Sequence, residues 1–459
     1  MNLRSLLHPA IAALAAPGAF AAADIDAPRL WQEVKVPSAL LQTTEVEGQH
    51  LTFGGDIRIG DLNGDGQLEF IVFRSTDEAM KPCFMGAFDL AGNVLWQIGE
   101  GGDQPARPGP VTIYDFDGDG RDEILHFWHD PMVENAVENM ADVRLQLRDG
   151  RTGELLREST PALFADAAGE GANWVHQRPF IANFRGGDRA QDFVVKLGER
   201  VIAFDDTLSP LWHYIIPWNE YTRCSAYIPA VGDIDGDGRD EVTGGYYLLD
   251  DDGTVMWAKQ LDRNMDSVSI EPWDGNTPRV IASGGGHVID AGGKPLIHLG
   301  EELVPHGQEV RVGDFVPTRP GREMIIRWNG HKANAMTVSQ TGEVLHRFML
   351  NDSPNHTGME TVYWHGHARP PLLYNGGVLW HGNGKRAADL PKLPAPIGPV
   401  KMGWYHAIPV NVLGDSAEEL VIYNPWESVV RIYRAASTDP EDLRDYQPTP
   451  RQYNARLMD

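Results

Sequence analysis

The chain is poor in cysteine, in basic residues and in long apolar runs. Only two of its 459 residues are cysteines, Cys83 and Cys224, so a disulfide scaffold is excluded. The two lie three sequence repeats apart (the repeats are described below), which favours free thiols over a pair. Asp and Glu number 65 against 39 Lys and Arg, giving a net charge of −26. That balance argues against nucleic acid as a partner, because phosphate binding requires a basic surplus.

The first 23 residues carry the pronounced apolar run and have the pattern of a secretory signal. Arg4 supplies a positive charge, residues 6–20 are mostly apolar, and residues 19–23 include the small residues that suit cleavage. The run is too short to span a bilayer, and no other stretch predicts a membrane span. We therefore expect a secreted or periplasmic protein whose mature chain begins near Asp24.

The remaining sequence predicts strands and turns in a repeating order. The chain contains 49 Gly and 32 Pro and shows little helical periodicity. Eight repeats of an apolar strand, a polar turn and a second apolar strand, usually followed by further strands, recur at intervals of roughly 40–70 residues, as four-stranded propeller blades do. We predict an all-β fold: a single β-propeller over residues 24–440 with eight blades, or seven if one repeat is a decoration, and a polar tail at 441–459. Two stacked sandwiches would not explain the repeat.

The ends of the repeat region predict how the ring closes. The eighth repeat lacks a fourth strand, whereas the segments LWQEVKV and LLQTTEVEG precede the first repeat. An N-terminal strand that completes the last blade would remove the open edge of the sheet. We therefore expect the propeller to be closed by an N-terminal strand.

Three turns match the pattern D-x-[DN]-x-D-G-x-x-E between the first and second strands of their repeats. Alternate carboxylates and amides, a Gly at position six and a later Glu suit Ca²⁺. Glu stands at position nine and strands flank the turn, so this is not an EF-hand. We predict structural Ca²⁺ in these turns, against the simpler reading of Asx-rich hairpins. The predicted metal residues occupy positions one, three, five, seven and nine of the three turns: Asp61, Asn63, Asp65, Gln67 and Glu69; Asp115, Asp117, Asp119, Arg121 and Glu123; Asp233, Asp235, Asp237, Arg239 and Glu241.

The propeller topology separates these turns from most histidines. Turns between first and second strands share one face, while second-to-third turns and connections between blades share the other. A single His at a strand end is usually structural, but a group that converges on one rim of a rigid scaffold suits a ligand site. The predicted substrate-binding residues on this face are Arg107, Arg178, Tyr221, Arg223, Asn264, His306, Gln308, His356, Trp404 and His406.

Several chemistries lack their motifs. No G-x-S-x-G elbow, phosphate-binding Gly loop or H-E-x-x-H pattern is present, and no facing carboxylate pair for glycoside hydrolysis is evident on the His-rich face. His, Tyr and Arg suit β-elimination beside a uronic acid instead. Arg neutralises the substrate carboxylate as charge develops, and His or Tyr moves the protons.

The phrases NMDSVSI, HGQEVRVGDF with RPGREMII, and the DxDGDGxDE turns resemble the β-propeller polysaccharide lyases, which include rhamnogalacturonan, ulvan and rhamnosyl-glucuronate lyases. The resemblance covers about Gly54–Arg434 as scattered blade phrases. Ulvan-type members imply catalysis by His residues, a Tyr and a carboxylate-neutralising Arg, in an order matched here by His129, His176, Tyr247 and Arg263. His126 and Tyr246 are alternates for His129 and Tyr247. Rhamnogalacturonan members imply Ca²⁺ near the substrate.

One position departs from the rhamnogalacturonan lyases. Asn264 stands where these lyases place a His, which favours an ulvan-like or rhamnosyl-uronate substrate. The resemblance implies a lyase that cleaves a rhamnose–uronic acid linkage in an anionic polysaccharide or oligosaccharide. Two rival hypotheses are a rhamnoside hydrolase on the same scaffold and a calcium-stabilised, non-catalytic glycan-binding propeller. We expect a monomer.

Overall fold

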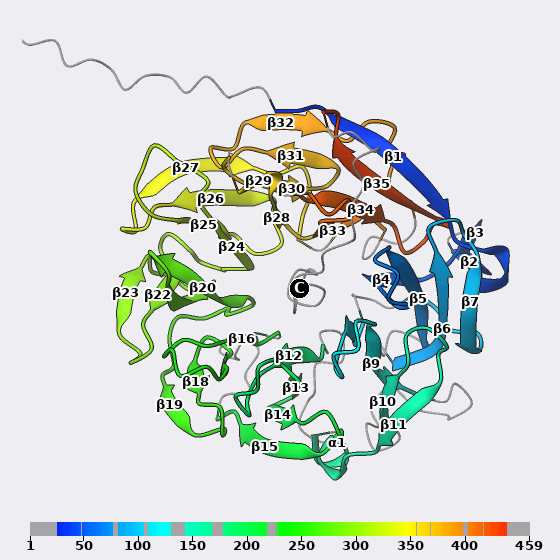
Figure 1. The fold of residues 1–459 in the computed structure, drawn as a ribbon. Coiled ribbons are helices and arrows are strands. Elements are labelled where there is room, and N and C mark those ends of the chain that lie inside the picture. Colours follow the sequence, from blue (N-terminus) through cyan, green and yellow to red (C-terminus); the bar gives the residue numbers. More distant parts are fainter. Residues whose placement is uncertain are drawn as a thin grey trace, which may run out of the picture.

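The computed structural model describes residues 25–46, 48–76, 81–104, 109–129, 143–167, 178–217, 226, 228–354, 356–367, 369–397, 403–415 and 417–437. Eight four-stranded antiparallel sheets stand as blades around one axis (Figure 1). The predicted all-β, eight-bladed propeller is therefore confirmed. The expected signal segment 1–23 and the tail 441–459 lie outside the described residues.

Blades one to four are built from consecutive strands. Their bounds are β4 (Asp56–Gly60), β5 (Glu69–Thr76), β6 (Lys81–Asp89) and β7 (Val94–Gly99); β8 (Val111–Tyr114), β9 (Glu123–Trp128), β10 (Arg144–Arg148) and β11 (Leu155–Ser159); β12 (Phe180–Ala182), β13 (Asp192–Leu197), β14 (Arg200–Phe204) and β15 (Pro210–Ile215); β16 (Ala230–Gly232), β17 (Glu241–Thr243), β18 (Tyr247–Leu249) and β19 (Val255–Ala258).

Blades five to eight follow the same plan, except that the last blade borrows a strand. Their bounds are β20 (Val268–Asp274), β21 (Thr277–Ala282), β22 (His287–Ile289) and β23 (Pro295–His298); β24 (Glu309–Gly313), β25 (Glu323–Arg327), β26 (Asn334–Val338) and β27 (Val344–Met349); β28 (Glu360–Val362), β30 (Leu372–Asn375), β31 (Val378–Trp380) and β32 (Arg386–Asp389); β33 (His406–Val410), β34 (Glu419–Tyr423), β35 (Val429–Ala435) and β1 (Pro28–Lys35).

A few elements lie outside the blades. They are the 3₁₀ helix η1 (Ser38–Leu40), the hairpin of β2 (Gln42–Val46) and β3 (Gln49–Phe53), the helix α1 (Ala162–Ala167) and the strand β29 (Trp364–His367).

The N-terminal strand closes the ring as predicted. β1 pairs antiparallel with β35, with Pro28 opposite Ala435 and Lys35 opposite Val429, and the two lie side by side in Figure 1. The outer edge of the last blade is thereby paired with the other end of the chain. The predicted strand pair divides: its first member completes the ring, and the second contributes to the separate hairpin of β2 and β3.

Apolar side chains fill the space between neighbouring blades. Eight buried clusters correspond to the eight junctions, from the junction of blades eight and one to that of blades seven and eight. Successive residues of a strand point to opposite faces of its sheet, so each inner strand contributes to two junctions. Neighbouring residues of one strand therefore contact different blades.

A buried carboxylate closes the turn between the first and second strands in several blades. The Glu that begins the second strand accepts the main-chain N–H of the residue seven positions earlier, which fixes the turn against the blade. The bonds are Leu62 N to Glu69 (2.8 Å), Phe116 N to Glu123 (2.7 Å), Ile234 N to Glu241 (2.7 Å), Val316 N to Glu323 (2.9 Å) and Val412 N to Glu419 (2.8 Å). The Glu in the sequence pattern therefore has a role in the fold whether or not an ion is bound.

The residue before this Glu joins one blade to the preceding one. The Asp122 carboxylate accepts the Asp61 N–H at 2.8 Å, and the Asp122 N–H donates to the Asp61 carbonyl at 2.9 Å. Asp240 forms the same pair of bonds with Asn183. These reciprocal bonds link blades one to two and three to four on the turn face.

Candidate functional site

The rim opposite the predicted calcium turns collects histidines from blades five to eight. We call this group the histidine rim: His287, His298, His306, His331, His356 and His406. His287 and His331 follow turns between second and third strands, His306 and His356 lie in connections between blades, His298 ends a fourth strand, and His406 begins a first strand. The order of strands in the blades therefore puts the second-to-third turns and the connections between blades on one face, as the repeat predicted.

The first pair of the rim is His306 with Asp266. His306 Nε2 lies 2.9 Å from Asp266 Oδ2, and the His306 side chain is 25% exposed while Asp266 is buried. Isolated bridges join Met265 to Gly307 and His306 to Asn329, which hold the neighbouring connections together. A carboxylate bonded to one imidazole nitrogen holds the ring in one orientation. The pair therefore presents an oriented, partly exposed imidazole at the surface.

The second pair is His356 with Asp352, farther along the rim. His356 Nδ1 lies 2.5 Å from Asp352 Oδ1, and the imidazole stacks on Trp404 with centroids 5.3 Å apart and planes 1° apart. Burial raises the pKa of Asp352, against the hydrogen bond from His356. Trp404 and His356 were both predicted to bind substrate, and the structure brings them together as a stacked pair on the rim.

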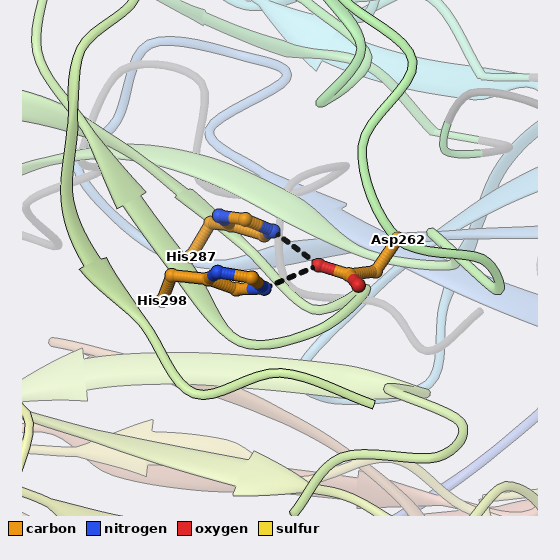
Figure 2. A group of neighbouring side chains, drawn as sticks. All are labelled: Asp262, His287 and His298. Carbon is orange, nitrogen blue, oxygen red and sulfur yellow. Dashed lines mark hydrogen bonds and ion pairs between the residues drawn. The ribbon is translucent and has the colours of Figure 1, made fainter. Parts of the chain in front are cut away.

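The third group is Asp262 with His287 and His298. Both imidazoles direct Nε2 to the same oxygen, Asp262 Oδ2, at 2.7 Å each (Figure 2). The rings lie nearly parallel with centroids 4.3 Å apart. Burial lowers the pKa of His287. None of these three residues was predicted from the sequence as a site residue, although pairing the third and fourth strands of the blade would have found His298 opposite His287.

Arg263 is the most accessible of the predicted catalytic residues that the structure describes. Its side chain is 57% exposed beside Glu301, with Nε 3.5 Å from the carboxylate. The next residue, Asn264, has φ 58° and donates from Nδ2 to the Pro305 carbonyl at 3.3 Å. Arg263 is thus placed on the rim next to Asp262, where its guanidinium can reach an anionic ligand.

The two tyrosines are both fully buried and face different junctions. Tyr246 belongs to the core between blades four and five, and its hydroxyl donates to the Asp262 carbonyl at 2.5 Å. Tyr247 belongs to the core between blades three and four, where its ring lies 5.3 Å from that of Tyr214. The structure therefore brings Tyr246, the alternate, to the loop that carries Arg263.

The histidines of blade two are also buried. His129 and His126 are fully buried. His126 Nε2 accepts from Arg148 Nε at 3.2 Å, and burial and the nearby guanidinium lower the pKa of His126 to about 3. His126 therefore stays neutral at ordinary pH.

The other predicted substrate residues divide into buried and undescribed groups. Arg178, Gln308 and His406 are buried, and His406 packs 5.5 Å from the Tyr423 ring. The remaining candidates lie outside the described residues: His176, Arg107, Tyr221 and Arg223. Of the cysteines, Cys83 is buried with Sγ 3.8 Å from the Arg74 carbonyl oxygen, whereas Cys224 falls outside the described residues, so their pairing stays untested.

A small cavity lies among the first strands of blades three to seven. Its volume is about 230 Å³, and its polar lining includes Arg311 and Glu360. Arg311 forms ion pairs with Glu309 at 2.9 Å and with Glu360 at 3.5 Å. Ligand pockets usually exceed about 300 Å³, so this cavity is too small for an oligosaccharide.

The calcium-type turns gather oxygen ligands as predicted. Carboxylate oxygens of Asp115, Asp117 and Glu123 lie within 4.8 Å of one another, as do those of Asp233, Asp235 and Glu241. Oxygen sets of this kind fit Ca²⁺. Burial raises the pKa of Glu123 and of Glu241 to about 8, with nearby Asp carboxylates adding to the shift. A bound cation would offset this concentration of negative charge.

Side chains of the three turns also bond to protein partners. In the first turn Asn63 Nδ2 donates to Glu69 at 2.8 Å, and burial raises the pKa of Glu69 to about 8. The side chain of Arg121 pairs with Asp119, and that of Arg239 pairs with Asp251 at 2.6 Å. The second and third turns therefore bring together carboxylate groups that can hold a metal.

Among the residues that the structure describes, no helix has the length and apolar character needed to cross a membrane.

Comparison with known proteins supports the resemblance expected from the sequence. The family model described as rhamnogalacturonan lyase family 11, C-terminal domain, matches residues 32–188. Two Bacillus subtilis (strain 168) proteins are similar at 26% identity: the rhamnogalacturonan exolyase YesX over 278 residues and the rhamnogalacturonan endolyase YesW over 265 residues. These matches cover 51% and 48% of this chain but 45% and 42% of the relatives. The chain therefore spans less than half the length of either relative.

A solved structure shows the same fold. The rhamnogalacturonan lyase PL11 of Bacillus licheniformis superimposes with a TM-score of 0.69 at 21% identity, over 89% of this chain and 76% of that chain. The V. cholerae biofilm matrix protein Bap1 superimposes less closely, with a TM-score of 0.53 at 12% identity, over 94% of this chain and 90% of that chain. At these identities the likeness concerns the fold alone. The family model and the two relatives confirm the resemblance to the β-propeller polysaccharide lyases, and the solved structures confirm the propeller fold.

Proposed function

We propose that this chain is a polysaccharide lyase that cleaves a rhamnose–uronic acid linkage by β-elimination. The observation that carries the proposal is the match of the rhamnogalacturonan lyase family model to residues 32–188, together with two similar proteins that are both named as lyases of rhamnogalacturonan. Rhamnogalacturonan is accordingly the first substrate to test, ahead of the ulvan-like polymer that Asn264 alone would favour.

The reaction needs three roles from the protein. A base removes the proton at C5 of the uronate, the C4–O4 bond breaks as the C4–C5 double bond forms, and an acid delivers a proton to the departing O4. Negative charge builds on the substrate carboxylate in the transition state, so a cation must already lie beside it. Arg263 is suited to that role because its guanidinium is 57% exposed on the rim and can bind a carboxylate through two parallel hydrogen bonds.

The acid and base are proposed from the resemblance and from the rim. His129, His176 and Tyr247 take these roles by resemblance, and Tyr246 stays the alternate to Tyr247 because its bond to the Asp262 carbonyl places it beside the residue before Arg263. The exposed pair of His306 with Asp266 is a further candidate, since the carboxylate holds the imidazole in one orientation. The stacked pair of His356 and Trp404 would bind a neighbouring sugar of the chain.

Calcium and export complete the proposal. Ca²⁺ in the three turns would stabilise the blades on the opposite face, and in the second and third turns the carboxylate oxygens already converge. The apolar N-terminal segment would direct the chain out of the cytoplasm, and the polysaccharide substrate lies outside the cell. The partly exposed candidates among the described residues would then face an anionic polymer, and the protein would act as a monomer; these candidates are Asn264, His306, His356 and Trp404.

The test is a digestion assay with three polymers. Purified protein with Ca²⁺ is incubated with rhamnogalacturonan, ulvan and a rhamnosyl-glucuronate polymer, and the ultraviolet absorbance of the unsaturated uronate is followed. Arg263→Ala should lower the rate at which the signal appears about 100-fold. Arg319→Ala, at an exposed arginine on the turn face, should leave it unchanged. Release of saturated rhamnose without absorbance would replace the proposal with a hydrolase, and binding without cleavage would replace it with a glycan-binding propeller.

A further inference from the structure

The group of Asp262, His287 and His298 has the geometry of a metal site. Its three ligand atoms, the two imidazole Nε2 atoms and a carboxylate oxygen, all lie within 4.8 Å of one another. Three separate segments supply them: the start of β22, the end of β23 and the connection between blades four and five. All three side chains point toward one place between them (Figure 2).

The β-sheet itself brings the two imidazoles together. His287 and His298 are directly opposite each other in the antiparallel pairing of β22 with β23. Side chains at opposed positions stand on the same face of a sheet with Cβ atoms about 5 Å apart, which explains the parallel rings at 4.3 Å. The imidazole pair is thus held by main-chain pairing and does not depend on a flexible loop.

The third ligand is held in place from two sides. The Tyr246 hydroxyl donates to the Asp262 carbonyl at 2.5 Å and fixes the main chain of the connection. Gly285, at φ 65°, leaves space for the carboxylate, because a Cβ on this residue would stand 2.2 Å from Asp262 Oδ2. A larger residue at 285 would therefore displace the carboxylate from the two imidazoles.

The chemistry of the three ligands selects the class of ion. Without an ion, both imidazoles must share a single carboxylate oxygen as hydrogen-bond donors. A divalent cation between them would use both Nε2 lone pairs and the carboxylate charge at once. Two imidazoles and one carboxylate suit Zn²⁺ and related first-row transition ions, whereas Ca²⁺ prefers oxygen ligands. His298 is 50% exposed and His287 4% exposed, so water can complete the coordination from the solvent side.

We propose that Asp262, His287 and His298 form a binding site for a divalent first-row transition-metal ion, with Zn²⁺ as the reference ligand. The site differs in ligand type and in face from the calcium turns. It adjoins Arg263, so an occupied site would fix the connection that presents this guanidinium. The proposal rests on the ligand geometry and stands whether or not the chain is a lyase.

The experiment measures metal binding directly on the full, untagged protein. The protein is stripped with a chelator, dialysed into saturating Ca²⁺ to occupy the turns, and titrated with Zn²⁺ by calorimetry, while bound zinc is counted by mass spectrometry. The variants are His298→Ala and Asp262→Asn. The matched control is His213→Ala, because His213 is also exposed and also lies in a fourth strand, β15 of blade three.

The wild-type protein and the control should each bind one equivalent of Zn²⁺ that saturating Ca²⁺ does not displace. His298→Ala and Asp262→Asn should weaken that equivalent at least tenfold, since losing even a supporting residue costs about 10- to 100-fold in metal affinity. Unfolding midpoints of the metal-free variants, compared with wild type, establish that they fold. The proposal is overturned if wild type binds no zinc equivalent in Ca²⁺, or if both variants bind it as tightly as wild type does.

Discussion

Glu419 offers a sharp test of how the turns are built, because it lies in a blade whose turn lacks the calcium pattern. It begins β34, is buried, and accepts N–H groups from Val412 at 2.8 Å and Leu413 at 3.2 Å. Burial, assisted by the nearby charge of Asp415, raises the pKa of Glu419 from 4.5 to about 8. The folded protein therefore holds this proton over a pH range in which the unfolded chain has lost it.

The sign of the pH effect follows from this raised pKa. A carboxyl whose folded pKa is raised contributes stability that is fully present below pH 4.5 and is lost as the pH rises through about 8. The shift corresponds to at most about 5 kcal/mol between these two limits. Glu419→Gln keeps an oxygen for the Val412 and Leu413 N–H groups but cannot ionise. The variant should match wild type near pH 5 and be more stable than wild type at pH 8.

The assay is chemical denaturation of wild type and variant between pH 5 and pH 8, with the difference in unfolding free energy plotted against pH. Glu154→Gln is the control, because Glu154 is exposed and its difference from wild type should stay flat. A Glu419→Gln variant that is less stable than wild type at pH 8, or whose difference does not change with pH, would refute the burial argument.

Three further predictions address the site, the ions and the ring closure. Arg263→Ala should lower kcat on the polymer about 100-fold, the usual cost of losing one group that stabilises transition-state charge. Arg263→Lys should recover part of the lost kcat, and an equal loss of kcat in Arg319→Ala would contradict the role of Arg263 in neutralising the substrate carboxylate. Chelation should lower the unfolding midpoint, and Ca²⁺ at a hundredfold excess over its dissociation constant should restore about 2.7 kcal/mol of unfolding free energy. No change in stability on adding Ca²⁺ would contradict the proposal that the turns bind it. Val34→Ala, at the junction of blades eight and one, should lower the free energy of unfolding by about 2 kcal/mol. Val94→Ala, at an exposed position, should lower it by less than about 0.5 kcal/mol. Equal losses of stability in the two variants would contradict ring closure by β1.

The fold was predictable because the pattern of strands and turns that produces it repeats along the sequence. Each repeat carries the same order of apolar strand, polar turn and apolar strand, and the missing last strand of the eighth repeat pointed to β1. The second predicted N-terminal strand did not join a blade but pairs as β2 with β3. An alternating pattern identifies a strand but does not name its partner, since several sheet edges offer the same hydrogen bonds.

The site was less predictable because it depends on strand phase and on pairs across strands. The neighbouring tyrosines 246 and 247 have the same chemistry, and only the alternation within the folded blade sends Tyr246 toward Asp262 and Tyr247 toward Tyr214. His298 lies eleven positions from His287 in the sequence, so no local motif joins them, whereas the pairing of β22 with β23 places them in contact. The calcium turns, by contrast, are local, and in the second and third of them carboxylate oxygens converge as the spacing predicts.

The most direct test of the proposed lyase activity counts two products of the same digestion. Rhamnogalacturonan is treated with the protein in Ca²⁺, and new carbon–carbon double bonds, measured by ultraviolet absorbance, are compared with new reducing ends. β-Elimination predicts one double bond for every linkage broken, and the loss of both signals together in Arg263→Ala. Reducing ends without double bonds, or no cleavage of any rhamnose–uronate polymer, would contradict the account.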